Sequence, residues 1–172
     1  MKILMCAVLV AMSVSGMSAL AMDDIEITVA RKKLDSNKDK PTAGIMTEER
    51  AIIYVATVEN KAFKPLENVT VKYNIFYEDV ELGSTAKPTV KSIKGTRAFA
   101  SIPRSDKAEF DTDPIKLGND SLGGNYYFVN GGESRARDKV VGVWFKAFDA
   151  AGKVIGEYAN PSTVPKKQTW KD

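Results

Sequence analysis

The chain has 172 residues, with 25 lysine and arginine residues, 22 aspartate and glutamate residues and no histidine. A net charge of +3 gives no reason to expect nucleic acid or an anionic membrane as a partner, and this length is enough to bury the core of one domain. The single cysteine, Cys6, lies near the N-terminus. The chain therefore lacks the residues for Ser-His or Cys-His nucleophile systems and for the common zinc sites. We expect a protein that is not an enzyme and that carries no cofactor and no metal.

The first 21 residues have the layout of a secretory signal peptide. Lys2 supplies a positive charge, residues 3–10 form an apolar run, and "SGMSALA" ends in an A-x-A pattern that predicts cleavage after Ala21. An uncleaved membrane anchor is the alternative, but the apolar run is shorter than the ~20 residues that a bilayer span needs. We expect residues 22–172 to form a single exported domain, secreted or periplasmic, with no membrane span after cleavage.

Alternation of apolar and polar residues indicates β-strands through most of the remaining chain. In "VTVKYNIFYED", for example, Val71, Tyr73 and Ile75 share one face, whereas Phe76 lies on the other. The segments expected to form strands are 25–30, 52–60, 69–79, 89–95, 96–102, 107–113, 140–149 and 153–158. Short strands separated by turns, with almost no helical periodicity, predict an all-β fold. The specific expectation is an Ig-like antiparallel β-sandwich of about seven to nine strands with long loops.

The apolar stretch 140–162 breaks at "DAAG" and resumes as "KVIGEY", a pattern typical of a β-hairpin. Asp149 suits the first position of a type I turn, and Gly152 suits the left-handed position that follows it. We also expect the strand bearing Trp144 to lie beside the strand bearing Phe76, as the third and sixth strands of an Ig-like sandwich do.

The stretch "VATVENKAFKPLENVTVKYNIFYED", followed by "VWFKAFDAAGKVIGEY", is similar to FxLYD-type and related bacterial Ig-like domains. Together with "RKKLDS", "EFDTD" and "GEYANPS", these motifs also resemble those of small exported proteins from verrucomicrobial-type bacteria. The resemblance covers nearly the whole mature chain. It implies the fold and export, and it implies no catalytic residues.

Two segments, 34–50 and 116–139, are expected to be long connections, which in compact domains are often functional. The first contains Asp35, Asn37 and Asp39 at a spacing that begins a calcium loop. The pattern then fails, because Lys40 replaces the required glycine and Met46 stands where a bidentate glutamate belongs. We favour a solvated, charged loop over a calcium site.

Asp111 and Asp113 are the best candidates for a pair of catalytic carboxylates, since residues two apart on a strand point to the same face. A strand end followed by acidic turn formers before Pro114 explains the same residues without catalysis. We favour that explanation.

Aromatic residues form the candidate ligand or partner surface. In the aromatic loop (123–132), Tyr126, Tyr127 and Phe128 either project as a stacking platform for a sugar or an apolar peptide, or fold back onto the sandwich. Strand periodicity also directs a second set of aromatic side chains away from the core, namely Phe76, Trp144 and Phe148. These three need a cover, which is the aromatic loop, the C-terminal tail with Trp170, or a partner.

The sequence thus favours an exported, non-catalytic binding or structural module whose partner is a protein or a component of the cell envelope. The alternative is a carbohydrate-binding or carbohydrate-active protein that uses the aromatic loop. The partner itself, protein or glycan, is not identified by the sequence.

Overall fold

A computed structural model describes residues 24–38, 44–124 and 126–170. Within these residues the fold is nearly all β, with nine strands in two antiparallel sheets. The expected β-sandwich is therefore confirmed. The expected signal peptide, residues 1–21, lies outside the described residues.

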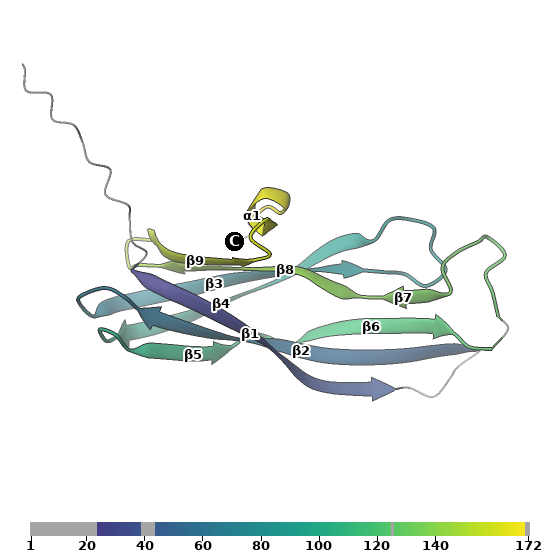
Figure 1. Cartoon of the computed structure of the whole chain (residues 1–172), viewed down its shortest axis with the longest axis horizontal. Coiled ribbons are helices and arrows are strands. Elements are labelled where there is room, and N and C mark those ends of the chain that lie inside the picture. The colour runs from purple at the N-terminus through teal and green to yellow at the C-terminus, as the bar shows by residue number, and fades with distance from the viewer. Residues whose placement is uncertain (1–23, 39–43, 125, 171–172) are drawn as a thin grey trace, which may run out of the picture.

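The first sheet has the order β1-β2-β6-β7, and β5 also pairs with β2. The second sheet has the order β4-β3-β8-β9. The strands of the first sheet are β1 (Ile25–Lys38), β2 (Ile45–Asn60), β5 (Lys107–Asp111), β6 (Ile115–Leu122) and β7 (Arg135–Arg137). Those of the second are β3 (Leu66–Asp79), β4 (Thr89–Ile102), β8 (Lys139–Phe148) and β9 (Val154–Asn160). A short helix, α1 (Val164–Lys167), lies over the outer face of β8 and β9 (Figure 1).

The main core lies between the two sheets, and strand periodicity explains its membership. From β3, the inward-pointing residues Val71, Tyr73 and Ile75 are all buried, and they meet Val143 and Phe145 of β8. β3 and β8 are neighbours in the sheet, as the sequence predicts. Such alternating burial is the pattern expected of a strand that has one face against a core.

The hairpin expected over 140–162 is present as β8 and β9. The carboxylate of Asp149 accepts hydrogen bonds from the backbone N–H groups of Ala151 and Lys153, at 2.9 and 2.8 Å. Gly152 adopts the left-handed conformation, with φ of +77°. The local turn chemistry therefore ends the strand where the sequence indicates.

Strands extend into both segments that were expected to be long connections. β1 continues to Lys38 and β2 begins at Ile45, so most of segment 34–50 is paired backbone. Likewise, β6 pairs with β2 over Ile115–Leu122, and all but the first of these residues lie in the second expected connection. The expected connections were too long because these strand halves carry polar residues on both faces, which removes the alternation that identifies a strand. Residues 123–134 do form a long connection, between β6 and β7. Segments 89–95 and 96–102 are also a single strand, β4.

Parts of three connections and the adjoining strand ends lie together at one end of the molecule, which we call the distal end. It consists of residues 44–46 at the start of β2, the β3–β4 connection (80–88) and the β6–β7 connection (123–134), at the right of Figure 1. Asp138, between β7 and β8, holds this end together. Its carboxylate accepts hydrogen bonds from the backbone N–H of Val80 at 2.9 Å and of Gly118 at 2.8 Å, which links the two sheets.

Candidate functional site

The outer face of the second sheet carries a small apolar cluster separate from the main core. Phe76 and Trp144 are 2% and 6% exposed, and Val164 of α1 packs against them. Trp170 covers Trp144 edge-on, with ring centroids 5.1 Å apart. The C-terminal segment therefore covers these two aromatic residues, and the aromatic loop does not take part.

Local features of the sequence position this cover. Gly142 of β8 leaves the space that Val164 occupies, because a methyl group on Gly142 would overlap the Cγ2 atom of Val164. The indole N–H of Trp144 donates to a carboxylate oxygen of Glu157 on β9 at 2.6 Å. The ammonium group of Lys146 lies over both indoles, 4.5 Å from the Trp144 ring centroid and 4.7 Å from that of Trp170. Burial of large rings with their polar atoms satisfied is typical of a structural cluster.

Phe148 does not join this cluster, although the sequence suggested one continuous patch. Lys146 intervenes between Trp144 and Phe148 along β8, and the register between β8 and β9 shifts at Ala147 and Phe148. The ammonium group of Lys72 lies 5.5 Å from the ring centroid of Phe148. The three aromatic residues therefore lie on the same face of the sheet, but Phe148 is not part of the apolar cluster that contains Phe76 and Trp144.

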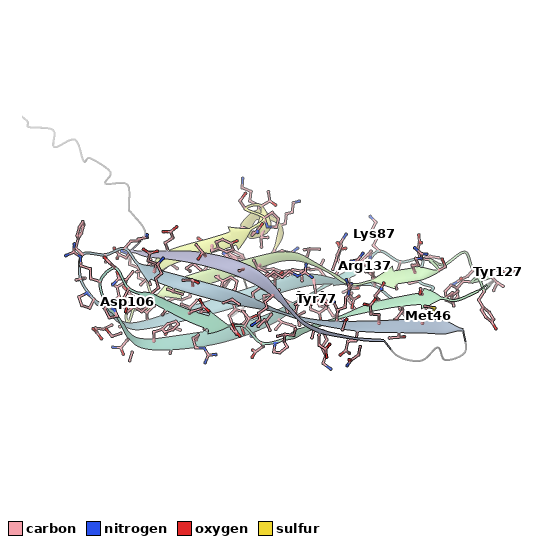
Figure 2. The ribbon with its side chains drawn as sticks, turned by 60° about the horizontal axis from the view of Figure 1, so that its bottom comes forward. Met46, Tyr77, Lys87, Asp106, Tyr127 and Arg137 are labelled. Atoms are coloured by element: carbon pink, nitrogen blue, oxygen red, sulfur yellow. The ribbon has the colours of Figure 1, made fainter. Side chains whose placement is uncertain are left out.

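At the distal end, by contrast, large apolar and aromatic side chains are exposed. Tyr126 and Tyr127 are 66% and 80% exposed, and Val129 is 96% exposed. Met46, at the start of β2, is 51% exposed and lies at the same end as Tyr127 (Figure 2). Exposed apolar groups gathered at one place mark interaction sites more often than scattered ones do.

The aromatic loop is attached to both neighbouring connections. Gly123 donates a backbone hydrogen bond to the carbonyl of Gly44 at 2.7 Å, and the Tyr126 ring lies where a Gly44 side chain would stand. On the other side, Gly83 donates to the carbonyl of Glu133 at 3.1 Å. The Phe128 ring packs against Gly83 in the same way. Phe128 thus anchors the loop, while Tyr127 and Val129 project from it.

A polar cavity of about 650 Å³ opens beside this loop. Its volume lies in the range of small-molecule sites. Most of the lining residues belong to the β3–β4 connection and to the adjoining ends of β3 and β4. The other two, Gly131 and Glu133, belong to the β6–β7 connection. The lining residues are Asp79, Val80, Glu81, Ser84, Thr85, Ala86, Lys87, Pro88, Thr89, Gly131 and Glu133. None of the motifs singled out in the sequence predicted this cavity, and the run of turn formers "ELGSTAKP" was the available signal.

The carboxylates suggested as a catalytic pair are both exposed, at and just beyond the end of β5. Asp111 ends β5 with its side chain exposed, Thr112 is buried, and Asp113 follows outside the strand. The hydroxyl of Tyr73 bonds to the Asp113 carboxylate and accepts from its backbone N–H, both at 3.0 Å. Burial raises the pKa of Tyr73. The contact ties the core of the second sheet to the β5–β6 connection, which is a structural role.

The segment weighed as a calcium loop belongs to a strand. Asp35 and Asn37 lie on β1, opposite Ala51 and Glu49 of β2. Asp39 lies outside the described residues. Across residues 24–38, 44–124 and 126–170, no group of three or more carboxylate, histidine or cysteine side chains is arranged to hold a metal ion. In the same ranges no helix has the length and apolarity to span a bilayer.

No protein-family model matches the chain, and no curated protein matches it. The solved structures that share features of its backbone include three of low sequence identity. A Northeast Structural Genomics Consortium target, SoR45, is 10% identical over 82% of this chain and 88% of its own, with a TM-score of 0.38. A protein from Akkermansia muciniphila is 11% identical over 91% of this chain and 82% of its own, with a TM-score of 0.33.

The third structure is β-glucuronidase 2 from Bacteroides uniformis, bound covalently to a cyclophellitol aziridine. It is 6% identical to this chain, with a TM-score of 0.38, and the match covers 76% of this chain but 12% of the enzyme. At these TM-scores none of the three structures informs on the function of this chain.

Proposed function

We propose that the chain is an exported, non-catalytic binding module that recognises a protein partner through its distal end. One observation carries this proposal: Tyr126, Tyr127 and Val129 are exposed on a loop that is fixed on both sides, and Met46 of β2 is exposed at the same end. Tyrosine rings bury a large area at a small entropy cost, and a loop already held in place needs little ordering on binding. Export is supported by the A-x-A pattern that ends at Ala21.

The strand order supports an Ig-like description of the sandwich. In that fold the C and F strands are neighbours, with G and C′ on either side. The order β4-β3-β8-β9 corresponds to C′-C-F-G, and β1-β2-β6 begins the opposite sheet. The connections of such a sandwich gather at its two ends, and binding residues often lie on these connections.

Site-specific photo-crosslinking tests the protein partner. A photoreactive phenylalanine analogue replaces Tyr127 in one variant and Phe63 in another, within cells that express the chain naturally. Phe63 is a matched control because it is 88% exposed and lies in the β2–β3 connection, at the end opposite the aromatic loop. We expect one defined protein adduct from position 127, competed by the unmodified chain, and none from position 63. Equal adducts at both positions, or none at either, would contradict the proposal.

A glycan ligand is the second candidate, favoured by the polar cavity beside the aromatic loop. Sugars stack their apolar faces on aromatic rings and exchange hydrogen bonds with carboxylates and hydroxyls. Glu81 and Glu133, with the hydroxyls of Ser84, Thr85 and Thr89, line the cavity. A glycan array probed with the mature chain and with Tyr127→Ala distinguishes the candidates. Binding of one glycan class that is lost in the variant supports the glycan, and no signal above background supports the protein partner.

A further inference from the structure

β4 is an outer strand of the second sheet. It pairs with β3 from Thr89 to Ile102, and no other strand pairs with it among the residues that the structure describes. Outer strands present a row of backbone N–H and C=O groups without a strand partner, and such a row can template the addition of another strand.

The other sheet edges are short, irregular or covered. β7 has three residues and β5 has five. β1 has a register shift between Lys33 and Asp35, which bends the edge away from regular pairing. β9 lies against β1, since Gly156 packs directly on the backbone carbonyl of Ile25. β4 differs from all of these, because its register with β3 runs from Thr89 to Phe99 without a shift.

The charge along β4 is of one sign. Residues 88–105 contain four basic residues and no acidic one, although the whole chain is almost balanced. The four are Lys91, Lys94, Arg97 and Arg104. The side chains of Lys91, Lys94 and Arg97 are all exposed, so the edge presents positive charge along most of its length.

The basic residues occupy both faces of the strand. Lys91 forms an ion pair with Asp79 on the inward face, where Arg97 also lies over the Phe110 ring, 5.8 Å from its centroid. Lys94 pairs in register with Asn74 and therefore lies on the outer face. A strand added to β4 would place its side chains about 5 Å from these groups on either face, where opposite charges stabilise and like charges destabilise.

We propose that β4 accepts an extended, acidic segment of another protein by strand addition. A second copy of this chain is a poor occupant, because β4 beside β4 brings basic residues together and contains no acidic residue to offset them. The surface is distinct from the aromatic loop, so the two proposals can fail separately.

Short labelled peptides test the proposal by fluorescence anisotropy and hydrogen exchange on the mature chain. The first peptide alternates glutamate and valine, the second alternates lysine and valine, and the third is the acidic peptide with proline at its centre. We expect saturable binding of the first peptide alone, with new amide protection in residues 89–98. Lys94→Glu should weaken binding about fivefold or more. The matched control, Lys33→Glu on the irregular edge of β1, should not change it.

Four results would overturn the proposal. Equal binding of the acidic peptide with and without proline would show attraction by charge without strand pairing. Protection that falls on the aromatic loop or β1, or no binding by the acidic peptide, would remove β4 as the site. Protection of residues 89–98 that rises with protein concentration in the absence of peptide would identify a second copy as the occupant.

Discussion

The indole of Trp170 stands edge-on to the indole of Trp144, with the two ring planes at 79°. This contact closes the C-terminal segment over the outer face of β8, and it accounts for aromatic residues that strand periodicity directs away from the main core. An edge-to-face arrangement is one of the two geometries that aromatic pairs prefer.

Trp144→Ala should lower the free energy of unfolding by about 3–5 kcal/mol, as for other buried large aromatic residues. Trp144 is 6% exposed, and its truncation also removes the hydrogen bond to Glu157. Urea denaturation followed by circular dichroism measures the change. Phe63→Ala, at an exposed ring, serves as the control and should have little effect. A loss of stability in Trp144→Ala that is no larger than the loss in Phe63→Ala would contradict a stabilising role for the C-terminal cover.

Gly142→Ala should be destabilising because the added methyl group meets Val164. Val164→Ala removes the colliding methyl groups, so the double variant should be more stable than the sum of the two single changes predicts. A double-mutant cycle from chemical denaturation measures this coupling. Strictly additive effects would place Val164 away from Gly142.

Asp138→Ala should lower stability by about 1–3 kcal/mol, because two partly buried backbone donors lose their acceptor. Those donors are the N–H groups of Val80 and Gly118. Hydrogen exchange should speed up in residues 79–89 and around Gly118. Glu109→Ala, at an exposed position of β5, is the control. Unchanged exchange in the β3–β4 connection would show that Asp138 does not link the sheets.

Stability should fall in alkali through two buried tyrosines. Burial is the main cause that raises the pKa of both Tyr54 and Tyr73 in the folded chain. The unfolded chain then loses these protons first, so the stabilisation is complete below about pH 10 and declines above it, by up to about 1.4 kcal/mol per pH unit for each group. Phe at both positions should flatten this decline relative to the wild type, whereas Tyr127→Phe should not. An equal decline in both variants would assign it to other groups, such as the ion-paired Lys61 and Lys91.

The exported form of the chain should begin at Met22. Intact mass spectrometry of material from the periplasm or the medium checks this expectation. A retained Met1 would contradict cleavage after Ala21, and recovery of the chain from the cytoplasm alone would contradict export.

Local patterns in the sequence determined the β-class, the hairpin at Asp149 and Gly152, and the face on which Phe76 and Trp144 lie. Each of these follows from short-range geometry: a strand alternates its side chains, and a turn needs specific residues at specific positions. The exposure of Tyr127 was one of two open alternatives, since a run of aromatic residues between glycines is compatible with a projecting or a folded loop.

Tertiary structure alone decided the rest. The polar halves of β1, β2 and β6 are strands because neighbouring strands satisfy their backbone hydrogen bonds, which side-chain alternation does not report. Segments distant in the sequence meet at the distal end, where Gly44 and Gly83 receive the rings of Tyr126 and Phe128. The contact of Trp170 with Trp144 and the open edge of β4 likewise depend on which distant segments of the chain become neighbours in the fold. No local sequence pattern specifies these neighbours.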